Sequence, residues 1–215
     1  MNGPLRVVRR SAGPAGALLV LLPGAYMTPE DFLAGGVDAA PDRFDLALPA
    51  LDLAVISGGK ALAAVHAEIL TPARVAGYRQ LWLGGISLGG LLALAYVADG
   101  LGPVDGLCLL APYPGSRITQ AAIAAGGGPR VWQPTSEQLA DPEFRVWAWL
   151  TQRPAHLPIF CGYGGEDRFA DGMATLAATL GVAPAVRPGG HDWPAWTALW
   201  RDFLAGGWLP GAEDR

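Results

Sequence analysis

A serine stands between two glycines near the middle of this 215-residue chain, in Gly85-Ile86-Ser87-Leu88-Gly89. The apolar run Gln80 to Leu83 leads into this segment, and the helix-like run Leu88 to Ala98 leads out of it. A serine on a tight turn between a strand and a helix presents its hydroxyl in a strained backbone that leaves no room for bulky neighbours. We therefore predict that Ser87 is a nucleophile, the alternative being a glycine-rich turn with an idle serine.

A serine hydroxyl attacks a substrate only when a base removes its proton, and the chain has three histidines. His191 follows the last predicted strand and precedes the last predicted helix, which Asp192 can cap. His66 falls within a predicted helix. His156 lies at the amino-terminal end of its predicted strand, away from the carboxyl ends where such sites form. His191 is the predicted base.

The imidazole must be held in one tautomer, which requires a carboxylate between the serine and the histidine in chain order. Asp167 is the best candidate, because it follows an apolar strand at the same predicted edge of the sheet as Ser87 and His191. Glu166 and Asp171 are nearby rivals. A turn or helix-capping role is the alternative for Asp167.

Backbone amides that could stabilise an oxyanion are predicted at two places. The amide of Leu88 lies at the amino terminus of the helix that follows the serine. A second amide is expected from the early loop Pro23-Gly24-Ala25-Tyr26, where the glycine lets the backbone approach a substrate. Ala25 is our choice and Tyr26 the next, although the loop alone could equally be an ordinary turn.

The elements that must position these residues are short apolar runs alternating with helical periodicity, which is typical of repeated βα units on a parallel sheet. Leu18 to Leu22 and Leu107 to Ala111 are continuously apolar, as expected for strands covered on both faces. We predict seven strands, near residues 5–9, 17–22, 43–49, 80–85, 105–111, 157–163 and 182–187. Helices are predicted over residues 57–70, 88–99, 169–180 and 194–205.

About 45 residues separate the strand ending at Ala111 from the one starting at Leu157, which is long for a connection in a compact domain. Two stretches with helical character, 116–125 and 136–150, flank the hinge-like Gly126-Gly127-Gly128. We predict one domain over residues 1–215, with 112–155 as a small helical cap. Its tryptophans could line an apolar acyl pocket or simply pack the cap onto the body; they are Trp132, Trp147 and Trp149.

Composition excludes several classes of function. The chain has 51% hydrophobic and 16% charged residues and a net charge of -4, so it lacks the basic surface of a nucleic-acid binder. Histidine and cysteine spacings match no metal site, and Cys108 and Cys161 lie in apolar runs as reduced core thiols. We expect no metal, no cofactor, no nucleic acid and no membrane span. The sequence does not indicate an oligomeric state.

The apolar run Ala17 to Leu22 follows Arg9 and Arg10, as in an export signal, but it is too short for one. Cleavage near this run would also remove the Pro23-Gly24-Ala25 loop. We therefore expect a cytoplasmic protein.

Taken together, Pro23-Gly24-Ala25, Gly85-Ile86-Ser87-Leu88-Gly89, Gly164-Gly165-Glu166-Asp167 and Gly190-His191-Asp192 resemble the α/β-hydrolase superfamily over nearly the whole chain. Small esterases and thioesterases are closest in character, although the family usually has His-Gly where this chain has Pro23-Gly24. The resemblance implies an eight-stranded sheet. We predict only seven strands, and we expect the missing eighth strand to be the first, antiparallel edge strand.

These residues predict a serine hydrolase that transfers an acyl group from a small ester or thioester to Ser87 and then to water. One alternative is a thioesterase or acyltransferase of a biosynthetic pathway, with an amine, alcohol or thiol as the acceptor. Another is a binding protein that keeps the fold without turnover, because fold alone does not determine function.

Overall fold

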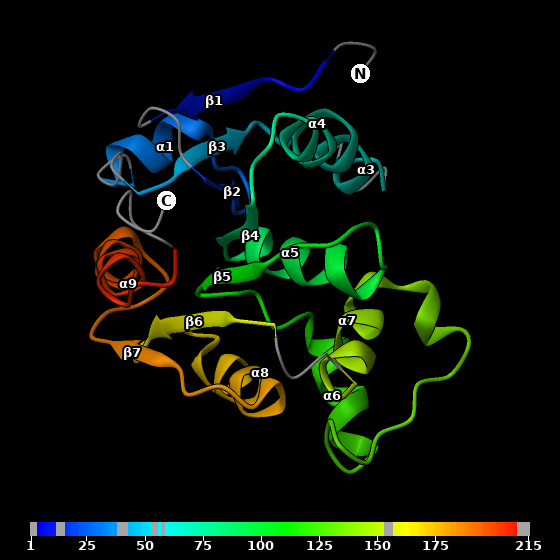
Figure 1. Ribbon diagram of the computed structural model, residues 1–215. Coiled ribbons are helices and arrows are strands. Elements are labelled where there is room, and N and C mark those ends of the chain that lie inside the picture. Colours follow the sequence, from blue (N-terminus) through cyan, green and yellow to red (C-terminus); the bar gives the residue numbers. More distant parts are fainter. Residues whose placement is uncertain are drawn as a thin grey trace.

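A computed structural model describes residues 4–11, 16–37, 43–52, 56, 59–152 and 157–209. This part of the chain forms a seven-stranded sheet with helices on both faces (Figure 1). The strand order is β1-β3-β2-β4-β5-β6-β7, and every pair is parallel except β1 with β3. His156 and the ends of several predicted segments lie outside the described residues.

The strands are β1 (Val7–Arg10), β2 (Ala17–Leu22), β3 (Asp45–Pro49), β4 (Gln80–Ile86), β5 (Gly106–Leu110), β6 (Ile159–Gly164) and β7 (Ala185–Arg187). The helices are α1 (Pro29–Ala34), α3 (Ala61–Val65), η1 (His66–Leu70), α4 (Thr71–Val75), α5 (Leu88–Ala98), α6 (Arg117–Ala125), η2 (Gln138–Ala140), α7 (Pro142–Leu150), α8 (Ala170–Leu180) and α9 (Trp193–Ala205). Each of the seven predicted strands has a counterpart here.

The continuously apolar strands are buried on both faces, as predicted. In β2, Leu18, Val20 and Leu22 face a core formed with α3, α5, α7 and α8. Leu19 and Leu21 face the opposite core, formed with α1 and α9. Alternate side chains of a strand point to opposite faces, so an unbroken apolar run is needed to fill both cores.

We expected the antiparallel edge strand to be missing, and this was wrong. The strand predicted near residues 5–9 is itself the antiparallel edge strand. It is β1, where Val7 pairs with Pro49 and Arg10 pairs with Leu46 of β3. The apolar pattern could not reveal its direction, because direction depends on the chain path that joins two strands. Arg9 and Arg10 are exposed on this strand, and charge protects an edge from pairing with another chain.

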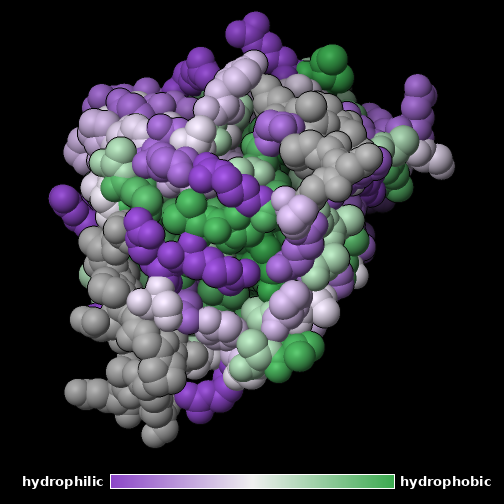
Figure 2. Space-filling model, turned by 90° about the horizontal axis from the view of Figure 1, so that it is seen from above, coloured by the Kyte–Doolittle hydropathy of each residue, from purple (hydrophilic) through white to green (hydrophobic). Residues whose placement is uncertain are grey.

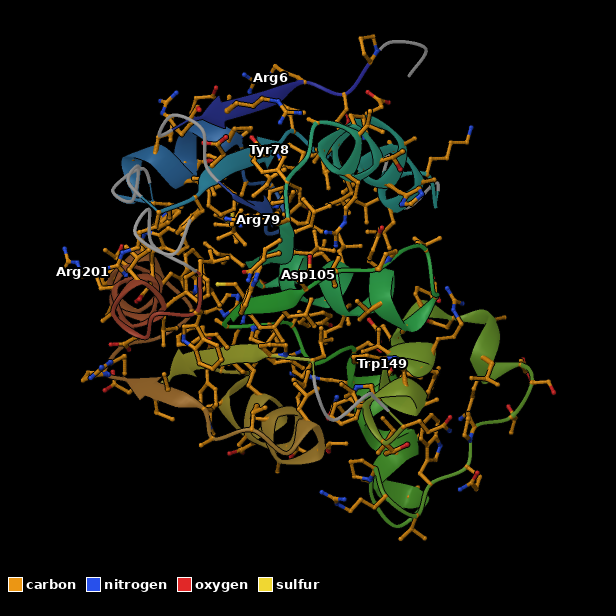
Figure 3. The ribbon with its side chains drawn as sticks, in the orientation of Figure 1. Arg6, Tyr78, Arg79, Asp105, Trp149 and Arg201 are labelled. Atoms are coloured by element: carbon orange, nitrogen blue, oxygen red, sulfur yellow. The ribbon has the colours of Figure 1, made fainter. Side chains whose placement is uncertain are left out.

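The side of the molecule that carries β1 shows hydrophobic surface between bands of hydrophilic side chains (Figure 2). Arg6, which precedes β1 and is labelled in Figure 3, pairs with Glu30 of α1 at 2.8 Å. No helix among the described residues is long and apolar enough to cross a membrane.

Two helical features differ from the prediction. Helix α1 was not predicted, because six residues are too few to show a period; its signal is the capping box between Thr28 and Asp31 with Pro29 at the first turn. The helix predicted over 57–70 continues to Val75 through the π-helical turn η1. Pro72 has no N–H to donate to the preceding turn of helix. An irregular turn just before Pro72 lets the helix continue with the smallest loss of hydrogen-bond energy.

The segment predicted as a cap contains α6, η2 and α7, and α7 packs against α5. Trp132 and Trp147 are 7% and 1% exposed, and both belong to the core on that face of the sheet. The indole N–H of Trp147 donates to the carbonyl of Pro114 at 2.9 Å. Trp149, labelled in Figure 3, is half-buried at the margin of the same core. Trp132 and Trp147 therefore form packed core rather than an open pocket wall.

Replacing Trp147 by alanine should lower the free energy of unfolding by about 3 to 5 kcal/mol, as expected when a large buried aromatic side chain is removed. The preference of the folded variant for long or short acyl chains should stay that of the wild type. Urea unfolding and chain-length profiles per folded molecule measure both effects. A changed profile with unchanged stability would instead place Trp147 in the acyl pocket.

Candidate active site

Ser87 lies at the turn between β4 and α5, in a backbone conformation that L residues rarely adopt, with φ 53° and ψ -116°. The turn is held from several sides. The Ser87 amide donates to Leu110 of β5 at 3.1 Å, and its carbonyl accepts from Gly90 at 2.9 Å and from Tyr113 at 2.9 Å. Strain of this kind persists only where surrounding contacts impose it. The result is a fixed hydroxyl at the carboxyl end of the central strand.

The glycines around Ser87 are required by close packing. A side chain at Gly85 would place its Cβ 2.5 Å from the Leu22 carbonyl oxygen, and one at Gly89 would overlap the same oxygen. The backbone of the loop after β2 therefore touches the first turn of α5 directly. This contact brings the predicted oxyanion loop next to the serine.

His191 lies in the loop between β7 and α9, where Asp192 caps α9 and Pro194 stands in its first turn, as predicted. Its Nε2 lies 2.8 Å from the Ser87 hydroxyl oxygen. Its Nδ1 lies 2.5 Å from Asp167 Oδ2. The structure thus brings together three residues that are far apart in the sequence.

Asp167 is held in the loop after β6, with a carboxylate that is fully buried. One oxygen, Oδ1, accepts the amide of Phe169 at 2.9 Å, which leaves Oδ2 for His191. The rivals make no such contact, because Glu166 and Asp171 are both exposed.

The acid loop and the histidine loop are joined through their backbones. The Gly165 amide donates to Arg187 at 2.8 Å, and the Glu166 amide donates to Gly189 at 3.0 Å. A side chain at Gly164 would overlap the Gly189 carbonyl. Close backbone packing of this kind sets the distance between the acid and the base.

Two aromatic side chains that we did not predict for the site flank the imidazole. Phe169 and Trp196 both meet the His191 ring edge to face, with ring centroids 5.3 Å and 5.2 Å away. Aromatic rings prefer this arrangement, and it restricts rotation of the imidazole. Trp196 lies on α9 and is buried, with 9% of its surface exposed. The position of Phe169 two residues after Asp167 carries no recognisable signal.

The two predicted oxyanion donors, the amides of Leu88 and Ala25, lie in different surroundings. Leu88 is the first residue of α5, where an amide has no carbonyl of a preceding turn to bind. In the other loop, a side chain on Gly24 would lie 3.3 Å from the Ile86 carbonyl, so this loop passes beside Ser87. Ala25 and Tyr26 are exposed, and the Tyr26 side chain projects into solvent with 88% of its surface exposed.

The two cysteines in the described residues do not compete with Ser87 as nucleophiles. Cys108 and Cys161 are free and buried; burial raises the pKa of the Cys161 thiol to about 12, and burial with the nearby Cys161 raises that of Cys108. No group of three metal-ligating side chains occurs within the described part of the chain.

An open hollow of about 530 Å³ lies between α1 and α9, and the three site residues do not line it. Trp193 and Arg201 contribute to its wall, and Figure 3 shows Arg201 extending from α9 toward solvent.

The chain matches no protein-family model and no curated protein. Its structure is nevertheless similar to solved structures of hydrolases. An α/β hydrolase from a metagenome of sediments of the Mar Chica lagoon in Morocco aligns with a TM-score of 0.63, over 96% of this chain and 95% of that one. This chain has the α/β-hydrolase fold. The identity in that alignment is 16%.

Other proteins with the α/β-hydrolase fold align equally well. A monoacylglycerol lipase from Paleococcus ferrophilus gives a TM-score of 0.63 at 15% identity, over 95% of this chain and 98% of that one. The S-formylglutathione hydrolase of Staphylococcus aureus gives 0.62 at 13% identity, over 89% and 81%. The predicted fold class, a mostly parallel sheet of about seven strands between helices, is confirmed.

Proposed function

We propose that this protein is a serine hydrolase that cleaves a carboxylic ester or thioester through an acyl-enzyme on Ser87. The observation that carries the proposal is the position of His191, with Nε2 2.8 Å from the Ser87 hydroxyl and Nδ1 2.5 Å from the buried Asp167 carboxylate. The same three roles recur on unrelated folds, so the geometry supports this function independently of the fold.

In the proposed reaction, Ser87 Oγ attacks the carbonyl carbon while His191 Nε2 takes the hydroxyl proton. Asp167 keeps Nδ1 protonated and stabilises the imidazolium that forms. The amides of Leu88 and Ala25 bind the negative oxygen of the tetrahedral intermediate. When the intermediate collapses, the bond to the alcohol or thiol breaks, and this leaving group takes the proton from His191. Water then repeats the sequence on the acyl-enzyme and releases the acid.

The structural neighbours support the same choice. They include a monoacylglycerol lipase, an S-formylglutathione hydrolase and a ferulic acid esterase. Their identities to this chain are 13% to 15%, so we take from them only the reaction class.

A fluorophosphonate probe tests the proposal, because it reacts with an activated serine and ignores an idle one. Native protein should gain one adduct, located by peptide mass spectrometry on Ser87, and heat-unfolded protein should gain none. Absence of an adduct on native protein would favour a binding protein.

Adding a primary alcohol or amine during hydrolysis of a p-nitrophenyl ester separates a hydrolase from an acyltransferase. A hydrolase forms mainly the acid, whereas an acyltransferase forms mainly the new ester or amide.

A further inference from the structure

An arginine stands beside the proposed catalytic residues without an assigned role. Arg168 directly follows Asp167 and is exposed. Its guanidinium carbon lies 4.7 Å from the centre of the Phe169 ring, and that ring in turn contacts His191 edge to face. Phe169 therefore contacts both the cation and the imidazole. A guanidinium on an aromatic face is held in place while its N–H groups stay free at the edge.

Tyr113 also contacts Phe169. Its ring meets Phe169 edge to face with centroids 5.2 Å apart, and its amide donates to the Ser87 carbonyl at 2.9 Å. Burial and the charge of Glu143 raise the pKa of the Tyr113 hydroxyl, whereas the charge of Arg168 lowers it. Phe169 thus contacts both the Arg168 guanidinium and the ring of Tyr113, whose backbone is bonded to Ser87.

The charge of Arg168 is not neutralised by a neighbour in the described residues. Four arginines there form ion pairs with carboxylates, namely Arg6, Arg74, Arg145 and Arg187. Arg168 forms none within those ranges, and its guanidinium lies over the Phe169 ring. An unpaired, oriented guanidinium is suited to bind a carboxylate through two parallel hydrogen bonds.

We propose that Arg168, positioned by Phe169 and Tyr113, recognises ester substrates that carry a carboxylate near the scissile bond. This inference rests on the proposed function and adds the substrate class. The carboxylate could belong to the acyl part or to the leaving group, because both pass close to Ser87 during the reaction. In either case, Arg168 binds the substrate and takes no part in proton transfer.

Three chromogenic esters test the proposal: p-nitrophenyl hexanoate, which is neutral; mono-p-nitrophenyl adipate, with a carboxylate on the acyl chain; and 3-hexanoyloxy-4-nitrobenzoate, with a carboxylate on the leaving group. Arg168→Gln should lower kcat/KM about tenfold for at least one charged ester, as expected for the loss of a charge-assisted hydrogen bond. It should leave the hexanoate within about twofold, because a neutral ester forms no charge-assisted bond with the guanidinium. The charged ester that responds identifies the side on which the carboxylate binds.

Two variants serve as controls. Arg168→Lys keeps the charge but loses the planar fork, and should fall between wild type and Arg168→Gln. Arg130→Gln removes the same charge at the far end of α8, where Arg130 donates to Ala178, and should leave all ratios unchanged. Raising the salt concentration should slow wild-type cleavage of the responding ester and spare the hexanoate.

Equal ratios of charged to neutral kcat/KM in wild type and Arg168→Gln, with the hexanoate still cleaved, would overturn this inference and leave the proposed function intact. Failure of the wild type to cleave any of the three esters, together with absence of a fluorophosphonate adduct, would overturn both.

Discussion

Replacing Ser87 by alanine should reduce kcat for a p-nitrophenyl ester by a factor on the order of 10⁴ to 10⁶, as in other enzymes that lose the nucleophile of such a triad. The change removes one oxygen atom, which is the atom 2.8 Å from His191 Nε2. Alanine has the same Cβ as serine, so the strained backbone at φ 53° and the contacts of Gly85 and Gly89 are unaffected.

The variant must be compared with wild type at equal amounts of folded protein. Its thermal unfolding midpoint should lie within a few degrees of the wild-type value, since a partly exposed hydroxyl contributes little to stability. Activity within a few-fold of wild type in such a sample would rule out Ser87 as the nucleophile, and with it the serine-hydrolase proposal.

Replacing Asp167 by asparagine should lower kcat on the order of 10⁴-fold, by analogy with removal of the orienting acid in other triads. Asparagine keeps the shape of the side chain and can still accept the Phe169 amide. It cannot carry the negative charge that holds Nδ1 of His191 protonated and stabilises the imidazolium. Steady-state kinetics with the same p-nitrophenyl ester measure the loss.

Two neighbouring acids provide matched controls for this variant. Glu166→Gln and Asp171→Asn each remove one negative charge from the same region, but both side chains are exposed and neither contacts His191. Each should retain activity within about threefold of wild type, since exposed charge pairs contribute little. A loss at Asp171 as large as at Asp167 would reassign the orienting role.

Much of the fold could be predicted from the sequence because burial on two faces imposes a local pattern. The unbroken apolar run of β2 and the glycine-bracketed Ser87 after β4 are both visible over a few residues. In contrast, the direction of β1 and the presence of α1 depend on the path of the chain and on a cap of four residues, Thr28 to Asp31. Apolar periodicity reveals neither the direction of β1 nor the presence of α1.

The role of the tryptophans could not be decided from the sequence. Trp132, Trp147 and Trp149 have a spacing that fits either a pocket wall or core packing. The structure places Trp147 beneath the loop at Pro114 with almost no exposed surface, which favours core packing for this residue. Which face of a helix is covered depends on its partners, and those are distant in the chain.

For the candidate site, the residue types and their order are visible in the sequence: a serine after one strand, an acid after a later one, and a histidine after the last. These positions follow from local turns at the carboxyl ends of parallel strands. The fold was needed to distinguish Asp167 from Glu166 and Asp171, because the distinction depends on which carboxylate is buried within reach of Nδ1. The fold also places Phe169 and Trp196 against the imidazole, since contacts between these rings depend on how two loops and helix α9 pack together and not on the spacing within any one segment.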